Sequence, residues 1–181
     1  DSGSEGDEPD EFYFPEYEPD PAPTEKITIQ PKRIASNHES TSGSFRITLD
    51  EEGKLWGWGA NKYGQVGNGE QTTSSYDATA YTPQEAKTEA RFVSVSAGAE
   101  HALAIDEEGN LWGWGKFEDP EEGNKNLQGI NTPTQLMIGR KYVYAEAGTS
   151  CSFAIDTDGK LWAWGSNSGQ LGDGTTSSVS E

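Results

Sequence analysis

The sequence predicts an all-β fold built from about three repeated antiparallel sheets. Three ten-residue segments with the pattern Asp-x-x-Gly-x-Leu-Trp-x-Trp-Gly are copies of one another and together contain all six tryptophans. These copies are residues 50–59, 106–115 and 156–165. Their anchoring glycines, Gly53, Gly109 and Gly159, lie 56 and 50 residues apart. This spacing is typical of propeller blades and not of helical solenoids.

Each copy lies in a predicted β-hairpin. Apolar residues alternate with polar or small residues just before it, at 45–49, 101–105 and 151–155, which is the period-two pattern of a strand. The acidic connection that follows ends in glycine, which adopts the left-handed conformation that a short hairpin loop requires. The next strand then reads Leu-Trp-Gly-Trp-Gly, with Ala163 in place of the middle glycine in the third copy.

The tryptophans are predicted to pack between neighbouring sheets. In strand 55–59, Trp56 and Trp58 share one face, and Leu55, Gly57 and Gly59 share the other, where the backbone is nearly bare. Burying an aromatic side chain removes about 150–250 Å² from water, which contributes about 4–6 kcal/mol per ring as an upper bound. The alternative is that exposed tryptophans form a sugar-binding or cation-binding surface.

One segment carries conflicting signals. Thr82-Pro83-Gln84-Glu85 has the form of a helix capping box, and residues 85–91 are good helix formers. The repeat register instead aligns this segment with 134–141, where Leu136-Met137-Ile138 has the character of a strand. We follow the register for its placement and allow for a helical turn there.

The charge of the chain excludes several classes of partner. The 181 residues include 13 basic and 31 acidic side chains, a net charge of −18. Such a chain lacks the positive field that supplies most nucleic-acid affinity, and anionic lipid surfaces repel it. No apolar stretch is long enough to span a bilayer, so we expect neither nucleic-acid binding nor membrane insertion. The single cysteine, Cys151, excludes an internal disulfide framework.

Residues 1–26 are predicted to be a disordered, acidic, Pro-rich tail. The first 25 residues contain ten acidic side chains, five prolines and no basic side chain. Such a stretch cannot bury enough apolar surface to offset the entropy lost on ordering. Residues 27–181 form the predicted folded domain. Because the chain begins with Asp1 and not Met, we expect it to be processed or to be part of a longer protein.

A family resemblance adds detail to this prediction. Residues 53–59 followed by Ala60-Asn-Lys-Tyr-Gly-Gln-Val-Gly-Asn-Gly69 resemble the repeat of the regulator of chromosome condensation family, and residues 166–174 and 97–105 are similar to further parts of it. The middle copy departs from the pattern, because residues 116–124 replace its Gly-Gln-Leu-Gly loop. The resemblance covers about residues 34–178 and implies a seven-bladed propeller of four-stranded antiparallel blades.

On this basis we expect a partial β-propeller of about three blades of antiparallel four-stranded sheet. Its repeats are predicted at about 34–96, 97–146 and 147–181, the last of them incomplete. Three blades are fewer than the four to eight that close a propeller. We therefore expect the chain to be a fragment whose open faces are covered by further repeats of the same protein or by self-association.

No enzyme signature is found, and we expect no catalysis, cofactor or metal. Asp156-Thr-Asp-Gly159 imitates the opening of a calcium loop, but the remaining oxygen ligands and the distal glutamate are missing, so acidic hairpin turns are the preferred interpretation. His101 matches Phe45 and Cys151 in the register and is predicted to point inward from its strand. The histidines show no spacing that assembles a nucleophile, a base and an orienting group.

The function is predicted from the long connections that follow the repeated hairpins. They leave equivalent strands, so they are expected to gather at one end of the array, where binding loops occur. The candidate protein-binding residues in them are Tyr63, Gln65, Tyr76, Tyr81, Phe117 and Gln170. The alternative is that each aromatic ring seals its own loop. We predict a non-catalytic protein-interaction module whose acidity favours a basic protein partner.

Two further functions are kept as alternatives. The resemblance implies a possible regulator of a catalytic partner, since family members include guanine-nucleotide exchange factors for a small GTPase and a similar bacterial propeller inhibits β-lactamase. Carbohydrate binding by exposed tryptophans is the third hypothesis. The acidic aromatic tail is expected to act as a solvated tether or to bind a basic groove. The acidic start of the chain also favours localisation as a secreted or cell-surface-tethered bacterial protein.

Overall fold

A computed structural model describes most of the folded part of the chain. The described residues are 33–36, 43–73, 80–118, 120, 128–176 and 179–180. The predicted tail, residues 1–26, lies outside them, and so does Tyr76. The described residues form strands, turns and loops and contain no helix.

Three antiparallel sheets of four strands make up the described part of the fold. The first consists of β1 (Ile34–Ser36), β2 (Phe45–Leu49), β3 (Leu55–Gly59) and β4 (Ala80–Glu85). The second consists of β5 (Phe92–Ala97), β6 (His101–Asp106), β7 (Leu111–Gly115) and β8 (Ile130–Leu136). The third consists of β9 (Tyr142–Ala147), β10 (Cys151–Asp156), β11 (Leu161–Gly165) and β12 (Val179–Ser180).

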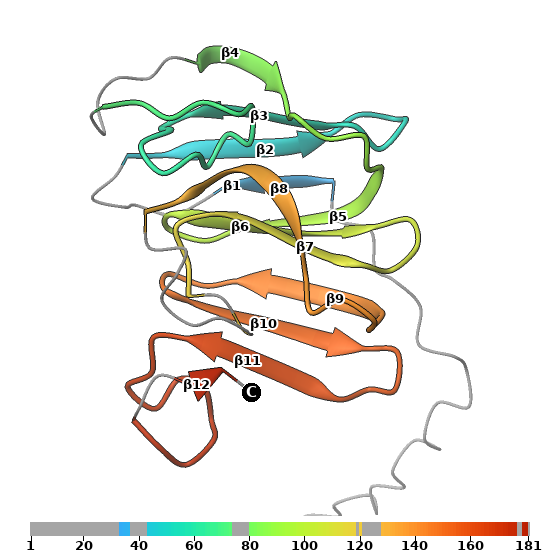
Figure 1. Ribbon diagram of the computed structural model, residues 1–181, viewed down its shortest axis with the longest axis vertical. Helices are drawn as coiled ribbons and strands as arrows, with labels where there is room; N and C mark the ends of the chain where they lie inside the picture. The colour runs from blue at the N-terminus through green and yellow to red at the C-terminus, as the bar shows by residue number, and fades with distance from the viewer. Residues whose placement is uncertain are drawn as a thin grey trace, which may run out of the picture.

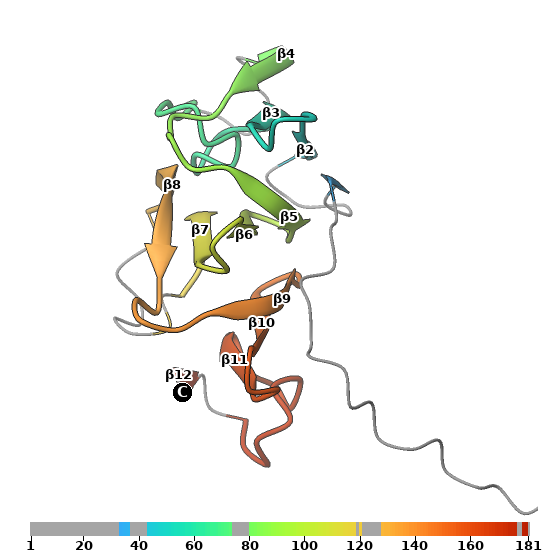
Figure 2. The same cartoon turned by 90° about the vertical axis from the view of Figure 1, so that its right-hand side faces the viewer.

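The three sheets stack one after another along the long axis of the molecule (Figure 1). Each is a meander in which every strand pairs with the next one in the sequence. The first strand of each sheet contacts the first strand of the next, β1 with β5 and β5 with β9, and the sheets fan out from this inner edge (Figure 2). This is the arrangement of consecutive propeller blades, so the prediction of an all-β partial propeller is confirmed.

The boundaries of the sheets differ from those of the sequence repeats. The repeat predicted at 34–96 contains most of β5, but β5 pairs with β6 and belongs to the second sheet. The second repeat, 97–146, likewise contributes three strands to the second sheet and most of β9, the inner strand, to the third. The third sheet includes the start of its outer strand, because Val179 and Ser180 of β12 pair with Gly165 and Trp164.

The hydrophobic core lies in two layers between the sheets. Each layer joins the large aliphatic and aromatic face of one sheet to the small-residue and tryptophan face of the next. The first layer includes Phe45, Ile47, Leu49 and Leu55 from sheet one with Phe92, Val95, Ala102, Ala104 and Trp114 from sheet two. The second includes Leu103, Ile105 and Leu111 from sheet two with Tyr142, Ala145, Ala147, Ala154 and Trp164 from sheet three.

The prediction that the tryptophans pack between sheets is confirmed in full for Trp114 and Trp164 and in part for Trp112 and Trp162, which pack against the two core layers. Trp56 and Trp58 of the first sheet lie in neither layer. Trp114 and Trp164 are completely buried between sheets, with 0% and 1% of their surface exposed. The first tryptophan of each strand and Trp58 are half-buried. On sheet three, Leu161 is 58% exposed, whereas its counterparts Leu55 and Leu111 are buried under the following sheet.

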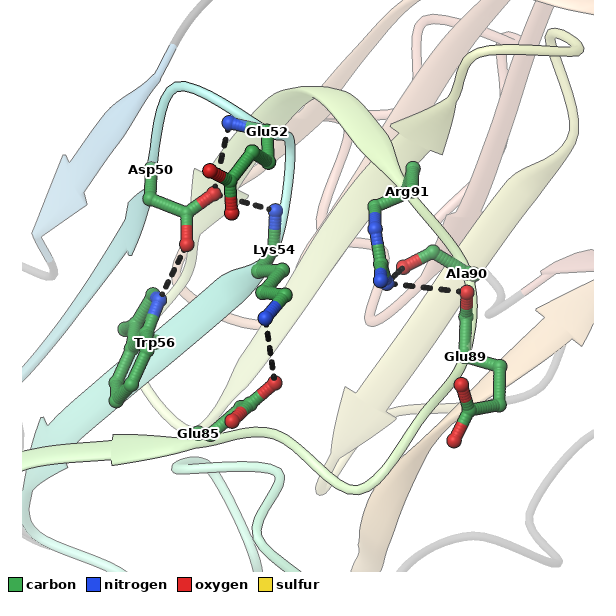
Figure 3. A network of polar contacts seen from close by, with 8 residues as sticks. All are labelled: Asp50, Glu52, Lys54, Trp56, Glu85, Glu89, Ala90 and Arg91. Atoms are coloured by element: carbon green, nitrogen blue, oxygen red, sulfur yellow. Dashed lines mark hydrogen bonds and ion pairs between the residues drawn. The ribbon is translucent and has the colours of Figure 1, made fainter.

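The turn of each hairpin is held by its leading aspartate. In the first hairpin, Asp50 Oδ1 accepts hydrogen bonds from the backbone N–H groups of Glu52 (3.0 Å) and Lys54 (2.9 Å). Its Oδ2 accepts a bond of 3.0 Å from Trp56 Nε1 (Figure 3). Gly53 has the predicted left-handed conformation, with φ at +76°. Bonding to the indole of Trp56 holds the pKa of Asp50 below its ordinary value.

The segment with conflicting signals is a strand. Residues 80–85 form β4, in which Glu85 pairs with Trp56 and Gln84 with Gly57, and residues 86–91 contain no helical turn. Pairing with a sheet edge therefore overrides the local helix signal of the capping box.

Candidate protein-interaction site at the loop end

The described parts of the connections after β3, β7 and β11 lie at the same end of the sheets, on the left of Figure 1. The hairpin turns that are held by the leading aspartates lie at the opposite end. This separation follows from the meander, because the second and third strands of each sheet run in opposite directions. The structure therefore places the candidate binding loops side by side along one edge of the stack.

The loop after β3 is organised by a buried asparagine. Asn61 Oδ1 accepts the N–H of Val66 at 3.0 Å, and its Nδ2 donates to the carbonyl of Glu70 at 3.0 Å. The backbone N–H of Thr72 donates to the carbonyl of Asn61 at 3.0 Å. One side chain thereby closes the loop over itself, which is a common role of asparagine in turns.

This loop is fastened to the second sheet. The backbone N–H of Gly69 donates to the carbonyl of Asn131 at 2.8 Å, and Asn131 Nδ2 donates back to the carbonyl of Gly69 at 2.9 Å. The buried Trp114 Nε1 donates to the carbonyl of Gln65 at 2.8 Å. The interface between the first two blades is therefore made by a loop as well as by the sheets. The indole of Trp114 meets main chain, as predicted, but this main chain belongs to the loop and not to a strand.

The second and third loops differ at the organising position. Asn167 takes the place of Asn61 in the third loop, where its Oδ1 accepts the N–H of Gly169 at 2.9 Å and its Nδ2 donates to the carbonyl of Thr175 at 3.2 Å. In the second loop the same register position is Phe117. A Cβ on Gly113 would lie 3.2 Å from the Phe117 ring, so this ring packs beneath strand β7.

Two of the predicted binding residues are buried. Gln65 is 0% exposed, and its Oε1 accepts the N–H of Tyr63 at 2.8 Å. Phe117 is 6% exposed. The Phe117 ring therefore packs inside the protein, as in the alternative interpretation in which an aromatic ring seals its own loop, and the Gln65 side chain is likewise enclosed by its loop.

The other predicted residues have varied positions. Tyr63 is half-buried, and Gln170 is exposed at the third loop, where its Oε1 accepts the N–H of Ser168. Tyr81 lies in β4, but its side chain is outside the described part of the chain, as is the whole of Tyr76. The structure therefore brings Tyr63 to the interface of blades one and two and leaves Gln170 on blade three.

Basic side chains that the sequence did not single out surround Tyr63. Lys116 Nζ lies 4.7 Å and Lys62 Nζ lies 5.2 Å from the centre of the Tyr63 ring, both within cation–π range. Lys116 also pairs with Glu100 at 3.0 Å, which raises the pKa of Lys116. Lys62 and Lys116 are 54 positions apart in the sequence, and only the stacking of the blades brings them together.

A pocket of about 310 Å³ lies beside this cluster, between blades two and three. It is lined by Glu100, His101, Lys116, Phe117, Glu118, Thr149, Ser150 and Ser166. His101 is buried at its wall, as predicted, and His101 Nε2 lies 2.9 Å from Ser152 Oγ of the next blade. Burial lowers the pKa of His101 to about 4, so its ring is neutral at pH 7.

This histidine and serine form a contact between blades and not a catalytic pair. Both residues are buried, with 1% and 2% of their surface exposed, so Ser152 cannot meet a substrate. Among the described residues, no group of three or more His, Cys, Asp or Glu side chains is arranged to hold a metal ion. The same part of the chain contains no helix long and apolar enough to cross a membrane.

The fold and the loop end define a class of protein: a β-propeller array that is built from repeated blades and displays loops. Residues 52–105 match a family model for the regulator of chromosome condensation (RCC1) repeat, and residues 92–119 match a second model of the same repeat. Residues 52–119 of this chain therefore contain sequence of the RCC1-repeat type.

The relatives that this chain matches are considerably longer than the chain. The mitochondrial RCC1 domain-containing protein RUG3 of Arabidopsis thaliana is 32% identical over 97 residues, which cover 54% of this chain and 21% of RUG3. The ultraviolet-B receptor UVR8 of the same plant is 40% identical over 77 residues, which cover 41% of this chain and 17% of the receptor. The chain therefore matches about a fifth of the length of these relatives.

A solved structure shows the same fold. Prp20p from Saccharomyces cerevisiae, whose crystal structure was described with its binding properties to Gsp1p and histones, superposes with a TM-score of 0.62. The match has 22% sequence identity and covers 75% of this chain and 35% of Prp20p. At this identity the likeness concerns the fold.

Proposed function

We propose that this chain is a non-catalytic protein-interaction module that presents its loop end to a protein partner. The observation that carries the proposal is the cluster of Tyr63, Lys62 and Lys116, which two blades build together at a loop end that is rigidly fastened. A half-buried aromatic ring flanked by cations is the kind of anchor that is enriched in protein interfaces. The protein partners described for Prp20p support a protein partner here.

The cluster is preorganised for binding. Reciprocal hydrogen bonds between Gly69 and Asn131 hold the loop on the second sheet, and a Cβ on Gly129 would lie 2.3 Å from the carbonyl oxygen of Tyr63. The backbone of Tyr63 is therefore in close contact with the connection that leads to β8. Little conformational entropy is lost when such a residue binds, and this favours affinity.

The experiment compares partner capture by three purified proteins. Immobilised wild-type chain, Tyr63→Ala and the hairpin-end control Lys54→Ala are exposed to extract of the source organism, and bound proteins are quantified by mass spectrometry. A direct partner is then purified and titrated by calorimetry. We expect Tyr63→Ala to weaken binding about tenfold or more, as for an aromatic hot spot, and Lys54→Ala to bind as wild type. Equal binding by all three proteins contradicts the proposal.

The finer alternative is that the module regulates a catalytic partner. It is supported by the match of residues 52–119 to the repeat of the regulator of chromosome condensation. The test is the release of a fluorescent guanine nucleotide from a small GTPase with and without the chain. If the chain accelerates nucleotide release and Tyr63→Ala abolishes this acceleration, the regulatory role is supported. If the release rate is unchanged by the chain, the regulatory role is contradicted, whereas the proposal of an interaction module is unaffected.

A further inference from the structure

A second pocket lies at the opposite end of the molecule, at the hairpin turn of blade two. It encloses about 450 Å³. Its lining consists of Glu89, Ala90, Arg91, Asp106, Glu107, Glu108, Asn110, Trp112 and Gln135. Trp112 is half-buried, and one edge-to-face contact with Phe92, at 5.7 Å between ring centres, fixes its indole. The site is thus a fixed aromatic wall beside several carboxylates.

In blade three, side chains of the chain itself occupy the position that corresponds to this pocket. The register between β5–β7 and β9–β11 is a constant 50 residues, so Trp162 is the counterpart of Trp112. Two cations of the chain cover the Trp162 ring: Arg140, with its guanidinium carbon 4.1 Å from the ring centre, and Lys160, with its Nζ at 4.0 Å. This face of the fold therefore binds cationic side chains in one blade.

Both cations are missing from blade two. The counterpart of Arg140 is Ala90, and the counterpart of Lys160 is Asn110; both of these residues line the pocket. Within the described part of the chain, no cationic group lies over the Trp112 ring at the distances seen on Trp162. The pocket is therefore the space that the arginine and the lysine fill in blade three.

The pocket also carries negative charge that blade three lacks at two positions. Glu89 and Glu107 line the pocket, and their counterparts in the 50-residue register are the uncharged Gly139 and Thr157. The cation in the lining, Arg91, bends back and donates to the carbonyl oxygens of Glu89 (3.2 Å) and Ala90 (3.3 Å) (Figure 3). Carboxylates around an aromatic face strengthen its attraction for a cation.

Three hydrogen bonds keep the floor of the site in place. Trp112 Nε1 donates to Asp106 Oδ2 at 2.8 Å. Asn110 Nδ2 donates to the same oxygen at 2.8 Å, and its Oδ1 accepts from Lys141 Nζ at 2.8 Å. Asn110 is therefore held by two partners and does not have to move when a cation enters over the ring.

We propose that the Trp112 pocket binds the guanidinium group of an arginine carried by a partner protein, in the place that Arg140 and Lys160 occupy on Trp162. A planar guanidinium stacks on the indole and donates to the carboxylates of Glu89, Glu107 and Glu108. The site lies at the other end of the molecule from the loop cluster. The proposal of an arginine-binding site rests on the proposed function in one respect: the arginine belongs to a protein partner.

The experiment is an NMR titration of the six indole N–H signals. The probe is Nα-acetyl-arginine N-methylamide, and the matched control is its citrulline analogue, which has the same shape without the charge. Loss of one signal in Trp112→Phe assigns Trp112. We expect the arginine probe to shift this signal saturably, with an affinity at least about tenfold higher than that of citrulline, while the Trp162 signal does not respond.

The decisive variant is Ala90→Arg, which copies blade three and fills the pocket with the chain's own guanidinium. The affinity of Ala90→Arg for the arginine probe should be about tenfold or more below that of wild type, whereas Tyr63→Ala should bind the probe as wild type does. Free arginine, whose α-carboxylate faces the acidic rim, should bind more weakly than the blocked probe; tighter binding would exclude a protein source. Equal shifts with citrulline, or unchanged probe binding by Ala90→Arg, would overturn the proposal without touching the loop-end function.

Discussion

Asp106 and Trp112 are joined by a hydrogen bond of 2.8 Å between the carboxylate Oδ2 and the indole Nε1. The same bond joins the aspartate and the first tryptophan of the other two hairpins, at 3.0 Å and 2.9 Å. In each case the second carboxylate oxygen accepts the backbone N–H groups two and four residues further on. One side chain therefore fixes both the turn and the strand after it.

Asp106→Ala is expected to lower the free energy of unfolding by about 2–3 kcal/mol, because the carboxylate accepts charge-assisted hydrogen bonds. Asp106→Asn should cost about 1 kcal/mol, since an amide retains one acceptor oxygen but turns its NH₂ group toward Trp112. Urea denaturation measures both. The neighbouring exposed Glu107→Ala is the control, and equal losses for Asp106→Ala and Glu107→Ala would contradict the role of the aspartate.

The burial of His101 makes the stability of the fold depend on pH. Burial lowers the pKa of His101 to about 4 from its ordinary 6.5, so between these values the unfolded chain binds a proton that the folded chain does not. The stability contributed by the neutral ring is complete above pH 6.5 and is lost as the pH falls toward 4. The expected loss is about 3 kcal/mol. Urea denaturation at pH 7.5, 6, 5 and 4 measures it.

A double variant separates this effect from other titrations. Phe45 and Ala102 hold the corresponding positions in the register between blades one and two, so His101→Phe with Ser152→Ala copies a contact that the fold already accepts. This variant should lose the dependence between pH 6.5 and 4. It should keep the loss of stability below about pH 4 that follows from the lowered pKa of Asp50 and Asp156, whose carboxylates bond to Trp56 and Trp162. If its pH profile equals that of wild type, His101 is not the titrating group.

The fold was predictable because its signals are local and repeated. The alternation before each hairpin and the glycine at its turn act within a few residues. The period of 50 to 56 residues repeats these local signals three times, so that a chance match in one copy carries little weight. At Pro83 the repeat register correctly predicted a strand, although the local sequence there indicated the start of a helix. The division of strands among sheets was not predictable in this way, because β5 lies at the end of one sequence repeat but is the inner strand of the next sheet.

The candidate sites were less predictable, since burial and contacts between blades decide them. Gln65 and Phe117 lie in the expected loops, but only the folded packing shows that both point inward. The cations around Tyr63 come from two blades. The Trp112 pocket had a signal in the sequence, namely Ala90 and Asn110 aligned with Arg140 and Lys160. That signal gains meaning only when the cations are seen on the Trp162 ring.

Replacement of the middle glycine by alanine should have different costs in the first two Leu-Trp-Gly-Trp-Gly strands, at Gly57 and at Gly113. A Cβ on Gly57 would lie 2.6 Å from the backbone carbonyl oxygen of Val66, whereas one on Gly113 would first meet the Leu136 side chain at 2.7 Å. A flexible side chain moves more easily than a fastened loop. We expect Gly57→Ala to cost about 1–3 kcal/mol and Gly113→Ala less than about 1 kcal/mol, measured by urea denaturation. Equal costs would show that the loop at Val66 yields freely.

The two fully buried tryptophans should differ in the cost of replacement by phenylalanine. Trp114 Nε1 donates to the Gln65 carbonyl at 2.8 Å, while Trp164 Nε1 is buried with no hydrogen-bond partner among the described residues. Trp114→Phe leaves a cavity and an unpaired carbonyl, but Trp164→Phe leaves a cavity and removes an unpaired donor. Leaving a buried polar group unpaired costs about 1–3 kcal/mol.

We therefore expect Trp114→Phe to lower the free energy of unfolding by about 1–3 kcal/mol more than Trp164→Phe does. Urea denaturation followed by circular dichroism measures both variants against wild type. Because Trp114 also fastens the loop that carries Tyr63, its replacement should speed amide hydrogen exchange at Val66 and Gly67, whereas Trp164→Phe should leave these amides unchanged. If the two variants lose equal stability and exchange alike, the hydrogen bond to Gln65 does not hold the loop on the second blade.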